Sequence, residues 1–373
     1  MNNYYATVAP GLEAIAAREL LALGATEIRQ DYGGVHFQGN KELLYRANLW
    51  CRTIFRIFVP FAKIKSYNAS ELYRSVQNID WRAYLNPDMT LAVNCTGSNK
   101  HLNHTHFTAL QIKDAIVDWQ TKQSGKRSSV DVENPDLLIH AHLDNNRCLL
   151  SLDSSGSSLH RRGYRPAMGA APLKETLAAA ILEIAQWTPD LPFVDPMCGS
   201  GTLPIEASLK ALNIAPGLYR EFGFQTWLDF DAELWNKIEA EAEAQQLSVI
   251  DVPIIGSDRD STMLQQAKMN ARSWGLEQYI QFSQQEISSI EAPADRGIII
   301  CNPPYGKRLG DEAQLGELYR LLGDIFKQKF TGWTAYILTS SKQLSKQVGL
   351  RTSSRTKVYN GTISCTLLKY EMY

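Results

Sequence analysis

Apolar residues recur at helical spacing between residues 11 and 23, and Gly24 ends the pattern. Alternating and β-branched segments surround this helix and predict strands. In order, the elements predicted for the first part of the chain are strand 4–8, helix 11–23, strands around 28 and at 35–37, helix 42–49 and strand 54–64. Together they predict a small α+β unit.

A second compact α+β module is predicted between residues 69 and 155. Its elements are a helix at 71–76, a strand at 91–95, a long amphipathic helix at 106–123, and a hairpin that pairs 137–143 with 148–152. The residues between the two hairpin strands, Asp144 to Arg147, include two asparagines and are rich in turn formers.

Helix and strand patterns alternate beyond residue 156, as in a parallel α/β sheet. Helices are predicted at 173–187, 203–212, 232–246, 261–274 and 315–329, and strands at 193–195, 252–256, 280–282, 297–301, 333–338, 357–359 and 362–370. The last two strands flank Asn360-Gly361, a strong hairpin signal, so an antiparallel pair is expected to close one edge of this sheet. Phe222, Phe224 and Trp227 precede the second strand, and core packing is the expectation for them rather than lining of a target cleft.

Composition limits the class of protein. The chain has 373 residues, of which 44% are hydrophobic, and its apolar stretches are shorter than a membrane span needs. The first residues do not resemble a secretory signal, so a cytoplasmic location is expected. Six scattered cysteines are expected to be reduced thiols, and neither they nor His101, His104 and His106 predict a metal site. A net charge of −1 argues against a basic nucleic-acid binder, so any nucleic acid must be held by local features.

The first candidate site is the segment from Asp195 to Thr202, which contains Gly199 and Gly201. It follows an apolar strand and precedes a helix, where glycines let the backbone approach a ligand and the helix N-terminus offers N–H donors. Pro204 stands where the third glycine of the dinucleotide-binding fingerprint would fall, which argues against a dehydrogenase. Asp258, at the end of the next strand, is suited to bind both ribose hydroxyls, whereas Asp260 better suits a helix N-cap.

The second candidate site is Asn302-Pro303-Pro304-Tyr305, which follows another apolar strand. An exocyclic amine on a base is a poor nucleophile because its lone pair is conjugated into the ring. The Asn302 amide oxygen and the Pro303 carbonyl can accept its two N–H bonds and favour a pyramidal nitrogen, while Tyr305 can stack on a base swung out of its helix. A simple strand-ending turn explains the two prolines but not their combination with the Asp195 segment.

These motifs resemble those of class I amino-methyltransferases that modify adenine N6 or guanine N2. More narrowly, the chain is similar to bacterial 23S ribosomal RNA guanine-N2 methyltransferases that carry an N-terminal ferredoxin-like region and a THUMP domain. The similar stretches are residues 9–13, 45–50, 112–118, 159–165 and 171–175. The resemblance implies a Rossmann-like class I methyltransferase sheet with an antiparallel last strand at 157–373, preceded by α+β ferredoxin-like (1–65) and THUMP (66–156) domains.

The resemblance also implies the ligands and the residues that bind them. S-adenosyl-L-methionine is the implied cofactor, with contacts from Asp195, Gly199, Gly201, Thr202, Asp258, Glu286 (where Asp is more usual) and Asn302. The resemblance implies that the target amine is contacted by Asn302, Pro303, Pro304 and Tyr305. The implied partner is RNA, either 23S ribosomal RNA or a large-subunit assembly intermediate, with no membrane and no metal.

Local basic residues are the candidates for RNA contacts. They are Lys113 on the long helix, Arg161, Arg162 and Arg165 interleaved with Tyr164, and Lys307 and Arg308 just beyond the tetrapeptide. Salt bridges to neighbouring residues are the alternative for the arginines, and a solvated pair with Asp114 is the alternative for Lys113. Two other functions stay open: an adenine-N6 methyltransferase acting on DNA or RNA, and a non-catalytic RNA-binding factor.

Overall fold

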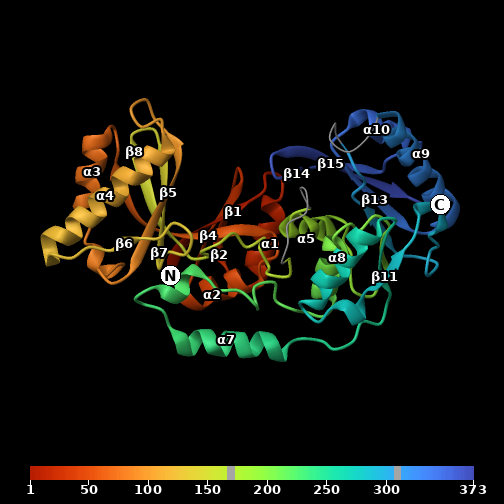
Figure 1. The fold of residues 1–373 in the computed structure, drawn as a ribbon, viewed down its shortest axis with the longest axis horizontal. Coiled ribbons are helices and arrows are strands. Elements are labelled where there is room, and N and C mark those ends of the chain that lie inside the picture. The colour runs from red at the N-terminus through yellow and green to blue at the C-terminus, as the bar shows by residue number, and fades with distance from the viewer. Residues whose placement is uncertain (166–172, 306–311) are drawn as a thin grey trace. The chain divides into compact units, whose positions relative to one another are not determined.

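The computed structural model describes residues 1–165, 173–305 and 312–373. The chain forms two compact units. Unit 1 consists of Met1–Val8, Ala17–Leu159 and Arg220–Glu239, and unit 2 consists of Ala9–Ala16, His160–Tyr219 and Ala240–Tyr373. Each unit contains one β-sheet, and Figure 1 shows the elements along the chain. Among the described residues, no helix is long and apolar enough to cross a membrane.

Unit 1 is built on a sheet in the order β2-β3-β1-β4-β8-β7-β5-β6. Its strands are β1 (Asn2–Val8), β2 (Thr26–Asp31), β3 (Gly34–Gly39), β4 (Ile54–Lys65), β5 (Thr90–Ser98), β6 (Ser129–Val130), β7 (Leu137–Asp144) and β8 (Arg147–Asp153). The long strand β4 pairs with β1 through its first half and with β8 from Phe58 onward. The two modules predicted from the sequence therefore share one continuous sheet.

Helices cover this sheet where their apolar faces meet it. They are α2 (Lys41–Trp50), α3 (Ala69–Gln77) and α4 (Thr105–Ser124), while α1 (Glu13–Ala22) follows β1. Buried Leu72 of α3 and Ile112 and Ile116 of α4 pack in one cluster with Leu91 and Ile139 of the sheet. Figure 1 shows α3 and α4 side by side beside β5 and β8. The side chain of His104 caps the first turn of α4 by accepting a hydrogen bond from the Phe107 backbone N–H.

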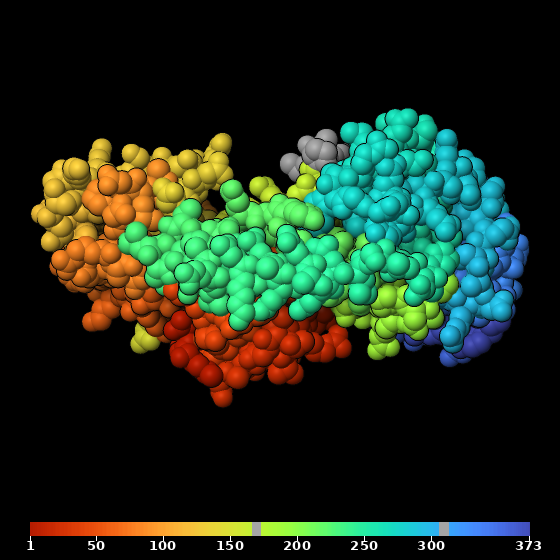
Figure 2. Space-filling view, turned by 90° about the horizontal axis from the view of Figure 1, so that it is seen from below, coloured from red at the N-terminus to blue at the C-terminus, as the bar shows by residue number. Residues whose placement is uncertain are grey.

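The segment Arg220–Glu239 packs on unit 1, although it follows the first βα element of unit 2 in the sequence. It contains the short helix η2 (Gly223–Thr226) and the start of α7 (Ala232–Ala244). The Phe224 ring stacks on Tyr45 with centroids 4.2 Å apart, and the Asp231 N–H donates to the Tyr45 hydroxyl at 3.1 Å. In Figure 2 the green surface of this segment lies on the red surface of the N-terminal residues. Phe222 and Phe224 are buried, so they pack in a core as expected.

Unit 2 contains the sheet β11-β10-β9-β12-β13-β15-β14. Its strands are β9 (Phe193–Asp195), β10 (Ile254–Asp258), β11 (Gln281–Gln284), β12 (Ile298–Cys301), β13 (Thr334–Thr339), β14 (Ser354–Asn360) and β15 (Ile363–Glu371). Its helices are α5 (Glu175–Ile184), α6 (Thr202–Ala211), α8 (Ser261–Arg272), α9 (Glu312–Lys329) and α10 (Lys342–Gln347). The strands from β11 to β13 run parallel, and β15 is antiparallel to both β13 and β14. This confirms the Rossmann-like sheet and its antiparallel hairpin.

Candidate active site

Three of the predicted site residues lie at the carboxyl ends of neighbouring parallel strands. Asp195 ends the central strand β9 and pairs in register with Gly256, so Asp258 lies two residues further along β10. On the other side, Val194 pairs with Ile299 of β12, which places Asn302 at a corresponding level beyond the strand. The chain leaves β9 with β10 on one flank and β12 on the other, which is the switch point where open α/β sheets bind ligands.

The glycine segment between β9 and α6 adopts a backbone that glycine alone accommodates well. Gly201 has φ +81° and serves as the N-cap of α6, and a Cβ there would lie 3.0 Å from the Cβ of Ala267 on α8. Gly199 also has a positive φ, of +52°. The segment therefore approaches α8 closely and leaves the first N–H groups of α6 without a side-chain cap, available to an anionic group.

The carboxylate of Asp258 fixes the glycine segment to the end of β10. Its Oδ2 accepts the Gly199 N–H at 2.9 Å, and its Oδ1 accepts the Asp260 N–H at 2.9 Å. The Cys198 N–H also donates to the Ser257 carbonyl at 2.9 Å. Each carboxylate oxygen retains capacity for a second donor, so ribose hydroxyls can still bind there. Asp260 caps α8 through the Thr262 and Met263 N–H groups, as expected.

Burial sets the protonation of the groups around Asp195. The side chain is almost fully enclosed, and this burial, reinforced by the negative charge of Asp258, raises the pKa of the Asp195 carboxyl well above its usual value. Its Oδ1 accepts the Met197 N–H at 3.2 Å. Burial likewise raises the pKa of the Cys198 and Cys301 thiols well above the ordinary range. These thiols stay protonated at neutral pH, so neither is suited to act as a nucleophile.

Asn302 presents an unusual polar atom at the end of β12. Its Oδ1 is buried and has no hydrogen-bond partner among the described residues. An acceptor left in that state costs about 1–3 kcal/mol, so such atoms need an explanation. An incoming N–H donor would supply the missing bond, which is the role predicted for Asn302 from the sequence. Pro303, next in the chain, is buried, and Pro304 is partly exposed.

Tyr305 is held by the β14–β15 hairpin. Its hydroxyl accepts a hydrogen bond from Asn360 Nδ2 at 3.3 Å and lies 3.6 Å from Cys365 Sγ, while its ring packs at the edge of the core around β12 and β13. Burial raises the pKa of this hydroxyl above its ordinary value. The sequence did not indicate this anchor, because Tyr305 and Cys365 are far apart along the chain. Stacking of Tyr305 on a base stays a prediction.

Glu286 lies just past the end of β11. The Gln285 N–H donates to the Asp258 carbonyl at 3.2 Å. Glu286 is therefore the neighbour of a residue that is bonded to the end of β10. Its side chain is exposed and forms no cap bond with the short helix η4 (Ile287–Ser289) that follows. It is therefore positioned for the predicted cofactor contact, which stays a prediction.

The basic stretch around Tyr164 is exposed only in part. Arg162 is 1% exposed, with its Nε 3.4 Å from Oε1 of the fully buried Glu206, to which the Tyr164 hydroxyl also donates. Arg165 lies 3.3 Å from Glu175 and donates to the Thr202 hydroxyl. Both arginines therefore form the salt bridges that were the alternative, and their contact with phosphate stays a prediction. Arg161 is exposed, and an RNA contact there stays a prediction.

The other predicted RNA residues stand differently. Lys113 forms an ion pair with Asp114 on the partly exposed face of α4, as its alternative supposed, and its RNA contact stays a prediction. Lys307 and Arg308 lie outside the described residues. Within the described ranges, no cluster of metal-binding side chains occurs.

The chain matches known protein families over most of its length. Residues 162–369 match the model of a family described as RMKL-like, methyltransferase domain. The chain belongs to this family. Residues 66–153 match the THUMP domain, and residues 3–58 match the RlmL ferredoxin-like domain. As an RMKL-like methyltransferase, the chain uses S-adenosylmethionine.

Relatives extend over the whole chain. A Synechocystis protein provisionally named as an RNA methyltransferase is 54% identical over 99% of this chain and 97% of its own length. The ribosomal RNA large subunit methyltransferase K/L of Syntrophotalea carbinolica is 40% identical over 99% of this chain but only 53% of its own length, so the chain spans about half of that protein. A crystal structure of a methyltransferase complexed with SAH matches with a TM-score of 0.88 and 33% identity, covering 100% of this chain and 98% of that one.

The residues of this RMKL-like methyltransferase fit the cofactor. The glycine segment lets the backbone approach a ligand, α6 offers N–H donors to a carboxylate, and Asp258 offers acceptors to ribose hydroxyls. The Asn302 oxygen, which has no hydrogen-bond partner among the described residues, can accept a bond from an incoming N–H donor. The relative bound to SAH, which is the demethylated cofactor, supports the same assignment.

Proposed function

We propose that this chain transfers a methyl group from S-adenosylmethionine to the exocyclic N2 amine of a guanine in 23S ribosomal RNA. The observation that carries the proposal is the buried Oδ1 of Asn302, which has no partner among the residues that the structure describes and lies at the same end of the sheet as Asp195 and Asp258. The cofactor supplies an electrophilic methyl group. Asn302 and Pro303 orient the acceptor amine toward it.

The chemistry follows from the lone pair of the amine. In the planar base this lone pair is delocalised, so the nitrogen attacks poorly. Acceptors at the Asn302 amide and the Pro303 carbonyl draw the two N–H bonds out of the ring plane, and their preorganised dipoles stabilise the positive charge that develops on nitrogen. As the bond from the amine nitrogen to the methyl group forms, the bond from that methyl group to sulfur breaks. One N–H proton of the cationic nitrogen then passes to water, and the products are a secondary amine and the demethylated cofactor.

The choice of RNA rests on the rest of the chain. Residues 66–153 match a THUMP domain, and the relatives with this arrangement are named as RNA or ribosomal RNA methyltransferases. The division into a ferredoxin-like region at 1–65, a THUMP domain at 66–156 and a methyltransferase domain at 157–373 is part of this proposal. So are the choice of guanine, an assembling large subunit as the acceptor, and action in the cytoplasm.

The direct test is incubation with labelled cofactor and deproteinised ribosomal RNA, followed by nucleoside analysis. We expect the label in N2-methylguanosine. Label found only in N6-methyladenosine would remove the guanine assignment, and label transferred to duplex DNA would favour a DNA methyltransferase.

A variant separates catalysis from binding. Asn302→Ala is expected to lower kcat by at least about 100-fold, the scale seen when one preorganised polar group is removed from an active site, while RNA binding is retained. Asn103→Ala, at an exposed site in unit 1, is the matched control. Unchanged RNA modification by Asn302→Ala would favour a non-catalytic RNA-binding factor.

A further inference from the structure

Unit 2 contains a cavity of about 500 Å³ that is rich in cations and hydroxyl groups. Its walls include Lys342 of α10 and Arg355 and Lys357 of β14, together with six serine and threonine side chains. Among the described residues that line it, none carries a carboxylate. This combination suits an anion that accepts several hydrogen bonds.

The cavity lies at the same end of the sheet as the candidate active site. Cys301 of β12 pairs with Ile337 of β13, so Thr339, which lines the cavity, stands two residues further and level with Pro303. Thr339 pairs with Thr366 of β15, and Thr366 pairs with Lys357 of β14. The cavity therefore lies across the three adjacent strands β13, β15 and β14. It begins at the level where the tetrapeptide 302–305 follows β12.

The hairpin separates the cavity from Tyr305. Ser364 and Thr366 line the cavity, and Cys365 between them contacts the Tyr305 hydroxyl. Because successive residues of a strand face opposite sides, Cys365 points away from the cavity that its two neighbours line. A strand of nucleic acid that passes over this edge of the sheet can reach both the cavity and Tyr305.

Two of the cations in the cavity have no ion-pair partner in the part of the chain that the structure describes. Lys342 and Arg355 are exposed, and neither forms an ion pair with a described residue. The Arg355 Nε donates to the Thr352 hydroxyl at 3.1 Å, which orients the guanidinium. Lys357 Nζ lies 5.1 Å from the centre of the Tyr359 ring. Like charges gathered in a hollow concentrate a positive potential, which attracts anions.

We propose that this cavity binds phosphodiester groups of the RNA strand beside the target nucleotide. The inference rests on the proposed function, and it adds a contact surface that the sequence did not indicate. Lysine and arginine supply charge to phosphate, and serine and threonine hydroxyls add directional hydrogen bonds, so these side chains fix the position of the strand without reading its bases.

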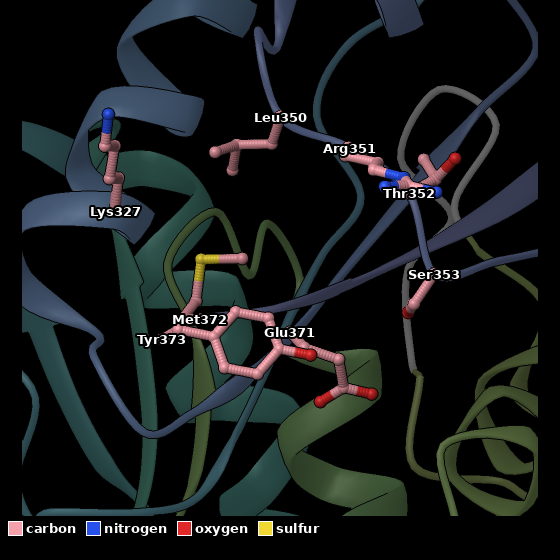
Figure 3. A pocket seen from close by; sticks show the side chains of 8 residues that line it. All are labelled: Lys327, Leu350, Arg351, Thr352, Ser353, Glu371, Met372 and Tyr373. Atoms are coloured by element: carbon pink, nitrogen blue, oxygen red, sulfur yellow. The ribbon is translucent and has the colours of Figure 1, made fainter.

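A second cavity in unit 2 provides the matched control. Figure 3 shows its lining, which includes Lys327, Arg351 and the carboxylate of Glu371. Glu371 pairs with Thr334 at the start of β13, so this cavity lies at the opposite end of the same strands. Arg296, exposed just before β12, lies at that end too.

The test compares two triple variants that remove the same charge. One is Lys342→Gln/Arg355→Gln/Lys357→Gln, and the control is Arg296→Gln/Lys327→Gln/Arg351→Gln. For each, the dissociation constant for a single-stranded ribosomal RNA fragment is measured by fluorescence anisotropy at several salt concentrations, together with kcat and KM for methyl transfer and the affinity for SAH.

The cavity variant is expected to bind RNA at least about 10-fold more weakly and to lower the slope of log K against log salt by about 2, or about 0.7 for each phosphate that is no longer neutralised. Its KM for RNA should rise, whereas its SAH affinity and the behaviour of the control variant stay unchanged. If wild type methylates RNA and the two variants behave alike, the cavity assignment fails and the proposed function stands. If wild type transfers no methyl group to RNA, both fail.

Discussion

The side chain of Asp258 accepts a hydrogen bond from the backbone N–H of Gly199 at 2.9 Å, and this contact joins the end of β10 to the turn after β9. This carboxylate therefore shapes the glycine segment, and we expect the same oxygens to accept the hydrogen bonds of the cofactor's ribose.

Asp258→Ala is expected to weaken SAH binding by about 10- to 100-fold, since hydrogen bonds to a charged group contribute about 1.5–3 kcal/mol each. Isothermal titration calorimetry measures this effect. Asp260→Ala is the control, because it removes only the cap of α8 and should lower the free energy of unfolding by about 1 kcal/mol. Equal affinities for SAH in the two variants would contradict the assigned role.

Gly201→Ala is expected to destabilise unit 2 and to impair cofactor binding. Alanine at φ +81° is strained by about 1 kcal/mol, and its Cβ would also crowd Ala267 at 3.0 Å. Gly125→Ala provides the comparison, since Gly125 has φ +68° but no neighbour within 4 Å of the methyl group that alanine would add. Urea unfolding and SAH titration should show the larger loss for Gly201→Ala.

Arg162→Met is expected to lower the free energy of unfolding by about 3–5 kcal/mol, because it leaves the Glu206 carboxylate buried without its cation. Arg161→Gln, at an exposed position, should change stability by about 0.5 kcal/mol or less. Chemical denaturation distinguishes the two. A variant at Arg162 that remained stable but lost RNA affinity would instead support the phosphate role expected from the sequence.

His140 should make unit 1 sensitive to acid. Burial of its ring, which stacks on Phe58 with centroids 4.3 Å apart, lowers the pKa of His140 to about 4. Between that value and the unfolded value of about 6.5, the unfolded chain binds the extra proton, so stability falls as pH drops through this window. With these two values, the expected loss at pH 4.5 is about 2–3 kcal/mol.

Protonation of Asp153 changes stability in the opposite direction as pH falls. A variant is therefore needed to isolate the contribution of His140. Burial raises the pKa of Asp153 to about 6 despite the nearby Arg56, so acid stabilises the fold through that carboxyl between its unfolded value and pH 6. His140→Gln keeps Asp153 and removes the imidazole. Denaturation midpoints of wild type and His140→Gln should therefore converge as pH falls, and parallel curves would contradict the assignment.

Local patterns predicted the elements well. The helix expected at 106–123 is α4 (Thr105–Ser124), and the Asn360-Gly361 signal lies at the turn between β14 and β15. Periodicity and turn chemistry act over a few residues, so they can be read along the chain. The short helix α10 received no prediction because its six residues carry too little apolar pattern.

Relationships between distant residues were not predictable in the same way. A run of arginines is usually solvated, and the spacing of Arg162 gives no sign that Glu206 lies buried beside it. Likewise, nothing near Tyr305 in the sequence indicates the bonds that its hydroxyl makes with Asn360 and Cys365. The strand-end positions of Asp195, Asp258 and Asn302 could be predicted from the sequence, because each residue stands at the end of an apolar strand.

The stacking of Phe224 on Tyr45 affects any attempt to dissect the protein. A fragment that begins at residue 157 would contain Phe222, Phe224 and Trp235 but would lack the N-terminal residues that enclose them. Such a fragment would expose an apolar aromatic patch to solvent and tend to aggregate. The complementary fragment would lack part of its own core, so the two halves of the gene product are best expressed together.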